Sequence, residues 1–201
     1  DKKDGLIASR EAYGKALANL ALNDDRILAI DAETGNSTFS DKVKEKTPKQ
    51  FIQTFIAEQN MIGIAMGLHV KGFKVFPSTF AAFLTRAYDQ IRMASISSCG
   101  MTVCGSHAGV SIGADGASQM GLEDIGMFRS LLGSNVFYPS DAVSCDRIVN
   151  ACSRLKGINY IRTTREKTTV LYGNDEKFPI EKFKVLKKSN KDKVVLVGSG
   201  I

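Results

Sequence analysis

The stretch FIQTFIAEQNMIGIAMGLHVKGFKVF, residues 51–76, decides the fold class. Its first part, 51–56, is mostly apolar and rich in aromatic and β-branched residues, which is typical of a buried strand. The apolar-rich run 59–70 predicts a helix that begins just after Glu58, and residues 72–76 predict a second, short strand. A strand, a helix and a strand in this order are typical of a parallel sheet with helices on its faces, so the sequence predicts an α/β fold.

The same alternation continues through the rest of the chain. Over residues 1–185 we expect a three-layer, doubly wound, mostly parallel sheet with helices on both faces. The final apolar run, 194–201, predicts a buried strand entering a glycine turn, so we expect 186–201 to be a linker and the first strand of a truncated further domain. The remaining expected elements are helices at 9–22 (capped by Ser9), 80–95, 122–132 and 142–155, and strands at 26–32, 101–105, 135–138 and 158–162.

Composition excludes several classes of protein. With 201 residues, 43% of them hydrophobic and 24% charged, the chain has the profile of one globular domain. No apolar run approaches the roughly 20 residues that span a bilayer, and no signal segment opens the chain, so we expect a cytoplasmic protein with no membrane partner. The net charge of +6 comes largely from lysines at 182–193, which we interpret as a solvated linker and not as a nucleic-acid surface. Four cysteines without a C-x-x-C pair, and only two histidines, argue against a metal site in this chain.

Three places hold residues that a globular core does not need. Glu58 stands between an apolar strand and an apolar helix, as a helix-cap acid or as a buried functional carboxylate. Phe80, Phe83 and Arg86 recur at a spacing of three, which would place two rings and a guanidinium on one helical face. That stripe is either ordinary core or a platform for a flat heteroaromatic ligand.

The third place follows the predicted strand 101–105. His107, Asp115 and Gln119 lie there among glycines and other small residues. Open α/β sheets bind their ligands beyond the carboxyl ends of the strands, so this segment favours a binding function over packing.

Taken in order, these segments resemble the central, pyrimidine-binding domain of transketolases, which are thiamine-diphosphate enzymes. The resemblance covers nearly the whole chain. The residues of its motifs are more similar to those of the animal-type branch than to those of the yeast or plant type. The matching segments are 8–14, 36–40, 57–61, 78–92, 104–107, 113–123, 137–141 and 161–165.

The resemblance implies where the aminopyrimidine of the cofactor would bind. The family glutamate at the position of Glu58 hydrogen-bonds the N1′ nitrogen and favours the imino tautomer, whose 4′-nitrogen takes the proton from C2 of the thiazolium. Phe83 corresponds to the ring that stacks on the aminopyrimidine. Phe80 lies beside it in the family, with Arg86 and Gln119 at its edge.

The resemblance also implies a reaction and its substrates. A two-carbon ketol unit passes from a ketose phosphate of the xylulose 5-phosphate class to an aldose phosphate of the ribose 5-phosphate class, as in the pentose phosphate pathway. Arg10, Ser37, His107 and Arg165 fall where the family holds the sugar phosphate, and two arginines suit a dianion. Asp115 falls where the family contacts a donor hydroxyl.

The sequence departs from the family pattern at several positions. Glu33 replaces a shorter aspartate near the cofactor, and Ala114 and Ala117 replace an acidic residue and a proline. The diphosphate- and metal-binding domain, with its Gly-Asp-Gly motif, would precede Asp1. We therefore expect Mg²⁺ or Ca²⁺ and the diphosphate to be bound by a homodimer partner, and the isolated chain, a fragment or a split-gene subunit, to be inactive.

Two other interpretations remain open. Deoxyxylulose-phosphate synthase and the β subunit of 2-oxo-acid dehydrogenases share the fold and the glutamate, but should lack the complete set of sugar-phosphate residues. A non-catalytic assembly module is favoured only by Glu33, Ala114 and Ala117.

Overall fold

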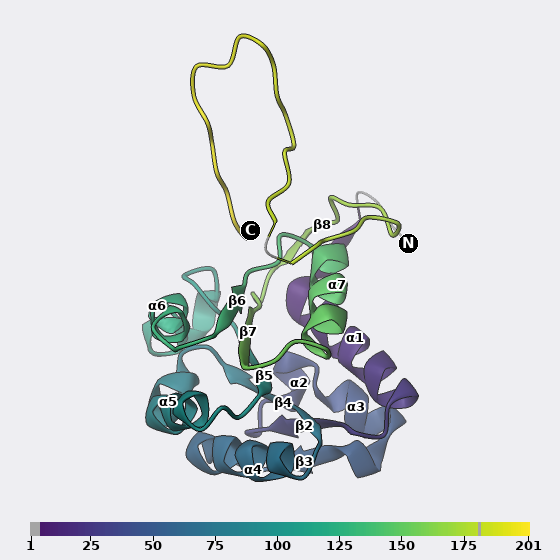
Figure 1. The fold of residues 1–201 in the computed structure, drawn as a ribbon, viewed down its shortest axis with the longest axis vertical. Coiled ribbons are helices and arrows are strands. Elements are labelled where there is room, and N and C mark those ends of the chain that lie inside the picture. Colours follow the sequence, from purple (N-terminus) through teal and green to yellow (C-terminus); the bar gives the residue numbers. More distant parts are fainter. Residues whose placement is uncertain (1–4, 181) are drawn as a thin grey trace.

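The computed structural model describes residues 5–180 and 182–201, so residues 1–4 and 181 of the predicted first domain lie outside it. Its centre is a six-stranded sheet with the order β3-β2-β4-β5-β7-β6, in which every neighbouring pair is parallel (Figure 1). A separate antiparallel pair is formed by β1 (Leu6–Ala8) and β8 (Lys167–Thr169). The strands of the main sheet are β2 (Ile27–Asp31), β3 (Phe51–Gln53), β4 (Lys74–Phe80), β5 (Met101–Ser106), β6 (Asn135–Phe137) and β7 (Ile158–Arg162).

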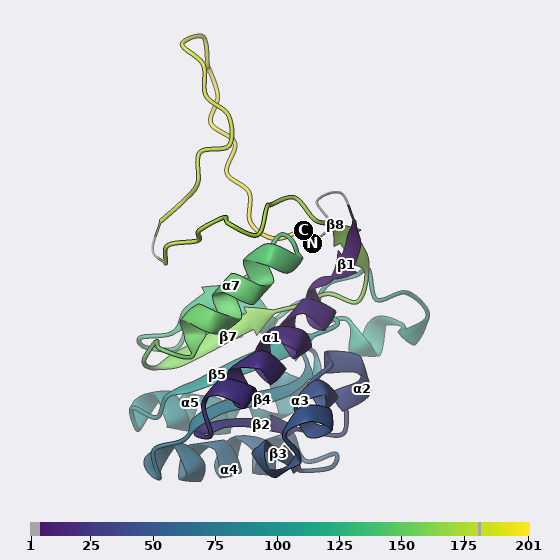
Figure 2. The same cartoon turned by 90° about the vertical axis from the view of Figure 1, so that its right-hand side faces the viewer.

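Helices cover both faces of this sheet (Figure 2). Successive residues of β2 point to opposite faces: Ile27 and Ala29 join one hydrophobic cluster, and Leu28 and Ile30 join the other. The predicted three-layer α/β fold is confirmed. The first cluster packs against α1 (Ser9–Asn23), α3 (Asp41–Lys46) and α7 (Ala142–Cys152), and the second against α4 (Glu58–Val70), α5 (Tyr88–Ile96) and α6 (Asp124–Arg129).

Several predicted boundaries were wrong. Ser9 does not cap α1, because it is already helical and its Oγ accepts a hydrogen bond from the Thr164 amide at 3.0 Å. The strand predicted at 51–56 ends at Gln53, and Phe55 and Ile56 are exposed. Phe55 has a left-handed backbone, with φ of 54°, which turns the chain toward α4.

The helix predicted over 80–95 was wrong at its start. Phe80 is the last residue of β4, and the amide of Ala81 still donates to the Ser106 carbonyl at 2.7 Å. The chain then forms a 3₁₀ turn, η2 (Phe83–Ala87), before α5 begins. Sheet pairing therefore overrides the helical spacing of the apolar residues. The helix predicted at 122–132 is likewise shorter and spans only 124–129.

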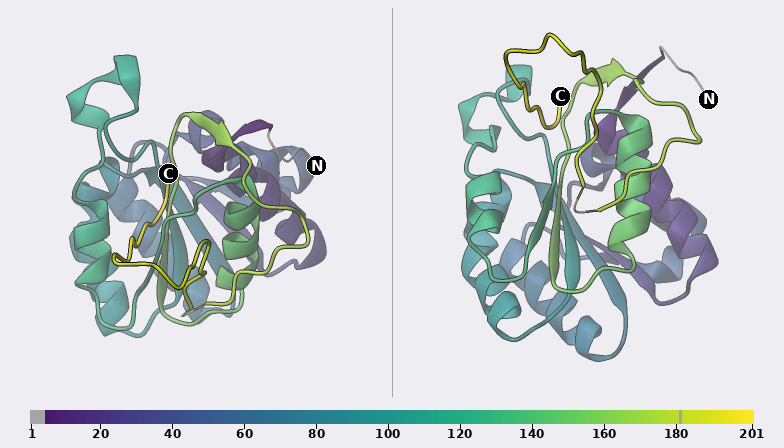
Figure 3. Two further views of the ribbon diagram at one scale, coloured as in Figure 1. Left: turned by 90° about the horizontal axis from the view of Figure 1, so that it is seen from above. Right: turned by 45° about the horizontal axis from the view of Figure 1, so that its top comes forward.

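The final segment is not a strand in this structure. Val194, Val195, Leu196 and Val197 are between 73% and 93% exposed. The chain after residue 187 loops out from the domain and returns, so that Gly200 lies against Tyr138 (Figures 1 and 3). A buried strand needs a neighbouring strand to pair with, and among the described residues no strand pairs with this segment. The proposed boundary after residue 185 stays a prediction.

Candidate functional site

The predicted site residues gather beyond the carboxyl ends of the parallel strands. Glu33 follows β2, His107 follows β5 and Arg165 follows β7 by three residues. Glu58 is the first residue of α4, the helix after β3. Because the strands are parallel, these separate parts of the chain reach the same edge of the sheet.

A continuous row of contacts runs along this edge. The Glu58 side chain is 1% exposed, and Arg86 Nη1 donates to its Oε2 at 3.0 Å. The guanidinium of Arg86 lies 4.9 Å from the centre of the Phe83 ring. Phe83 stacks on Phe80 with 5.1 Å between centroids, and Phe80 stacks on His107 with 4.0 Å between centroids. The carboxylate, the two rings and the imidazole thus form one assembly.

This assembly is not the helical stripe that the spacing predicted. Phe80 belongs to β4, whereas Phe83 and Arg86 belong to the 3₁₀ turn η2. The rings meet because the chain turns sharply at Ala81 and Ala82. The two rings do lie side by side, but the prediction that one helical face brings them together was wrong.

His107 is a buried, neutral imidazole. Burial, together with the positive charges of Arg10 and Arg165, lowers its pKa to about 4, and Asp115 opposes this shift. Its backbone is left-handed, with φ of 57°, and its Nδ1 lies 2.9 Å from the Ser106 hydroxyl. A neutral imidazole can donate or accept a hydrogen bond without the cost of burying a charge.

Arg10 connects the residues predicted to hold a phosphate. Its Nη1 donates to the Ser37 carbonyl at 2.9 Å, and its Nε donates to the Arg165 carbonyl at 3.2 Å. Arg165 contacts the Ile112 carbonyl and lies 3.8 Å from the Asp115 carboxylate. Burial and the charge of Arg165 lower the pKa of Arg10. Two guanidiniums held close together in this way favour an anionic ligand.

Glu33 and Gln119 are less constrained by the structure. Glu33 is exposed and has a left-handed backbone, with φ of 63°. Gln119 lies in the 3₁₀ turn Ala117–Gln119, half-buried, two residues before Gly121. Within the described residues, neither side chain makes a hydrogen bond or ion pair with Glu58, and their predicted roles at the cofactor stay predictions.

Sequence reasoning missed Asp31, which organises the loop carrying Glu33 and Ser37. Its buried carboxylate accepts hydrogen bonds from the Thr34 amide at 2.6 Å, the Ser40 hydroxyl at 2.7 Å and the Thr38 hydroxyl at 3.0 Å. Burial raises the pKa of Asp31, and these hydrogen bonds oppose that rise. The available signal was an acid at the end of a buried strand, followed by hydroxyl residues.

The arrangement fits the pyrimidine half of thiamine diphosphate. Glu58 Oε2 is held by Arg86, whereas Oε1 has no hydrogen-bond partner in the part of the chain that the structure describes. A buried carboxyl group beside stacked rings can share a proton with an aromatic ring nitrogen. Among residues 5–180 and 182–201, no cluster of His, Cys, Asp or Glu could hold a metal ion.

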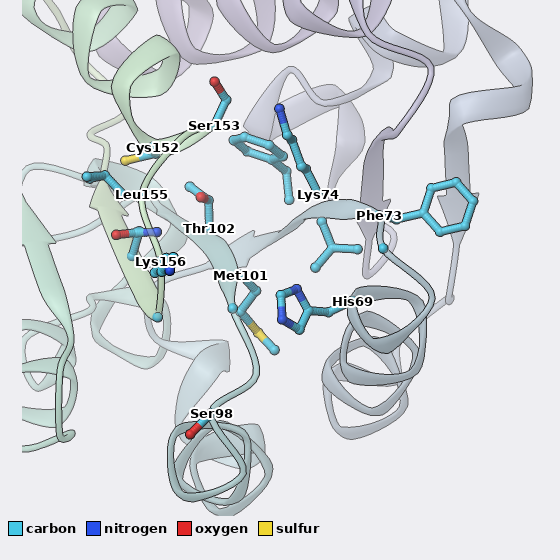
Figure 4. A pocket seen from close by; sticks show the side chains of 16 residues that line it. His69, Phe73, Lys74, Ser98, Met101, Thr102, Cys152, Ser153, Leu155 and Lys156 are labelled. Carbon is cyan, nitrogen blue, oxygen red and sulfur yellow. The ribbon is translucent and has the colours of Figure 1, made fainter.

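A pocket of about 350 Å³ lies at the opposite edge of the sheet, where β4, β5 and β7 begin (Figure 4). His69, Lys74, Met101, Cys152 and Lys156 are among the residues that line it. None of the predicted site residues reaches this pocket. Within the described residues, no helix is long and apolar enough to cross a membrane.

Comparisons with known proteins agree on one family. Residues 6–170 match the family model described as transketolase, pyrimidine binding domain. Human transketolase is 52% identical over 196 residues, and mouse transketolase-like protein 2 is 51% identical over 201 residues. These matches cover 97% and 100% of this chain, but the chain spans only 32% of the length of either relative.

Solved structures show the same fold. A split-gene transketolase, described as an inactive beta4 tetramer, has a TM-score of 0.78 and 36% identity, over 87% of this chain and 57% of that chain. The transketolase from Leishmania mexicana has a TM-score of 0.77 over 84% of this chain and 27% of its own, and at 21% identity this likeness concerns the fold alone.

Proposed function

Because this chain belongs to the transketolase pyrimidine-binding domain family, we propose that it supplies the aminopyrimidine half of a thiamine-diphosphate site that transfers ketol units between sugar phosphates. The observation that carries the proposal is the assembly of Glu58, Arg86, Phe83, Phe80 and His107. It joins a buried carboxylate to the residues proposed to hold the donor sugar. Thiamine diphosphate, when bound, supplies the thiazolium carbon that carries the two-carbon unit.

In this proposal the residues around the cofactor ring have separate roles. Glu58 holds and moves a proton at the ring nitrogen N1′, and Arg86 fixes the orientation of that carboxyl through Oε2. Phe83 and Phe80 bind the flat ring, with Gln119 and Glu33 nearby. The rings also exclude water from Glu58.

The donor sugar would bind beside His107. Arg10, Ser37, His107 and Arg165 are proposed to bind its phosphate, and Asp115 a hydroxyl. The contacts of Arg10 with Ser37 and Arg165 support this grouping. The substrates would be of the xylulose 5-phosphate and ribose 5-phosphate classes, as in the pentose phosphate pathway.

The rest of the proposed site lies outside this chain. We expect a homodimer partner to supply the diphosphate domain, with Mg²⁺ or Ca²⁺, in a cytoplasmic enzyme. The sequence contains no Gly-Asp-Gly motif, which supports this division. Residues 1–185 would form the pyrimidine domain, and 186–201 would lead into a further domain.

A paired assay tests the proposal. The complete protein containing this chain should form a seven-carbon ketose phosphate from xylulose 5-phosphate and ribose 5-phosphate, and the 201-residue chain alone should not. Calorimetry should show weak binding of thiamine diphosphate to the lone chain, since the diphosphate and metal contribute much of the anchoring. Micromolar affinity or turnover by the lone chain would overturn the half-site, and an inactive complete protein would overturn the activity.

A further inference from the structure

A buried ion pair joins the end of β7 to the start of α6. Arg162 Nε donates to Asp124 Oδ2 at 2.9 Å, and the two side chains are 11% and 0% exposed. The Tyr160 hydroxyl donates to the same carboxyl oxygen at 2.6 Å. Buried charges persist only when they are paired and hydrogen-bonded, so the ion pair with Asp124 fixes the direction in which the guanidinium points.

The other end of this guanidinium reaches the loop that follows His107. Arg162 Nη2 donates to the Gly121 carbonyl at 3.1 Å, and the Gly109 amide donates to the same carbonyl at 2.9 Å. Ala108 and Gly121 also form an isolated parallel bridge. The two ends of the segment 109–121 are therefore joined at one carbonyl, and Arg162 binds that same carbonyl.

Gly121 is held equally closely on its other side. A Cβ added to it would lie 2.5 Å from the Cβ of Ala81 and 3.0 Å from the backbone nitrogen of Ala82, so only a glycine fits there. Ala81 directly follows Phe80, whose ring stacks on His107. Gly121 thus lies between Ala81, next to the ring assembly, and Arg162. Any shift of Gly121 would displace the loop 109–121, which ends at this residue.

We propose that Asp124 and Arg162 are positioning residues, which set the placement of the loop 109–121, and so of Asp115 and Gln119, through the carbonyl of Gly121. This inference rests on the proposed function, in which Asp115 meets the donor sugar. The arginine fork is essential because Nε and Nη2 bind the carboxylate and the carbonyl at the same time. A lysine ammonium cannot span both acceptors in one geometry.

The kinetic test compares variants in the complete protein. Arg162→Lys should raise KM for the ketose phosphate about 10- to 100-fold, since small misplacements of positioning groups have effects of this size. Exchange of the cofactor C2 proton should stay within about twofold of wild type, because the proton is moved through Glu58 and saturating cofactor offsets any weaker contact of Gln119. Asp124→Asn keeps the shape of the side chain and should also raise KM while leaving C2-proton exchange nearly unchanged.

Tyr160→Phe is the matched control. It removes the bond to Asp124 and should lower Tm, yet it leaves the bond between Arg162 and Gly121, so KM should stay unchanged. If Tyr160→Phe raised KM as much as Arg162→Lys does, the effect would come from general destabilisation of the fold, and the proposal would be overturned. The same holds if Arg162→Lys slowed C2-proton exchange by as large a factor as it raised KM.

A second readout does not depend on activity. In the 201-residue chain, amide hydrogen exchange at Gly109 should be faster in Arg162→Lys than in Tyr160→Phe, because that amide is bonded to the Gly121 carbonyl. Equal exchange in the two variants would overturn the positioning role even if ketol transfer is observed. If the Gly109 amide exchanges faster in Arg162→Lys but the complete protein shows no ketol transfer, the positioning of the loop stands and only the proposed function is removed.

Discussion

The imidazole of His107 is stacked on the ring of Phe80, with 4.0 Å between centroids and 11° between planes. Phe80 is stacked in turn on Phe83. One aromatic ring therefore contacts both the proposed cofactor platform and the proposed substrate ligand. A change that displaces Phe80 is expected to affect both halves of the site.

The pKa of His107 is a direct check on this packing. NMR titration of the imidazole should give a pKa of about 4, well below its ordinary value of 6.5. Arg165→Met should raise that pKa because it removes a positive neighbour, and Asp115→Asn should lower it because it removes a negative one. As the pH falls, the unfolded chain is protonated at His107 before the folded chain. The contribution of His107 to the free energy of unfolding should therefore be complete above pH 6.5 and be lost as the pH falls toward about 4. Titration at 6.5 in the folded chain would contradict the burial of His107.

Glu58→Gln in the complete protein should slow exchange of the cofactor C2 proton. An amide can hydrogen-bond the ring nitrogen but cannot exchange a proton with it, and positioned proton transfer is typically worth about 100- to 10,000-fold. NMR of C2-proton exchange measures this step without any sugar. Glu45→Gln removes an equivalent charge from an exposed pair with Lys42 and should change nothing. Equal exchange rates in Glu58→Gln and wild type would refute the role of Glu58.

The proposed phosphate site can be separated from the cofactor site by choice of donor. Arg10→Ala or Arg165→Ala should lower kcat/KM for xylulose 5-phosphate about 10- to 150-fold, the loss expected for a hydrogen bond to a charged group worth roughly 1.5–3 kcal/mol. Hydroxypyruvate carries no phosphate and should be used normally, with one neutral aldehyde as acceptor throughout. If both donors lost activity equally, these arginines would be structural, and the assignment of a phosphate site would be withdrawn.

Gly105 should tolerate no side chain. A Cβ there would overlap the Tyr160 hydroxyl and lie 2.8 Å from the Tyr160 ring, inside the core. Gly105→Ala should therefore destabilise the chain by about 1–3 kcal/mol, as overpacking of a core typically does. Gly126→Ala is the control because a Cβ there meets nothing within 4 Å, and it should leave Tm unchanged or raise it. Equal Tm values for the two variants would show that the contact with Tyr160 is not as close as described.

The sequence was informative where a pattern has a local cause. β7 (Ile158–Arg162) was predicted with its observed bounds, since a buried run between turn residues leaves little choice. Phe80 was assigned to a helix because spacing alone cannot reveal that β4 continues its pairing with β5. Likewise, no local pattern could pair Arg162 with Asp124, because that contact depends on the tertiary fold. The roles given to the site residues came from the family resemblance and not from periodicity.

The four cysteines give the chain an internal probe of unfolding. Cys99, Cys104, Cys145 and Cys152 are all free and buried, and burial raises the pKa of Cys104 and of Cys152 to about 12. Thiolates, and not thiols, react with alkylating reagents, so the folded chain should be nearly inert to iodoacetamide. Modification would then proceed only through opened states, and its rate would report how often α7 and β5 separate from the core.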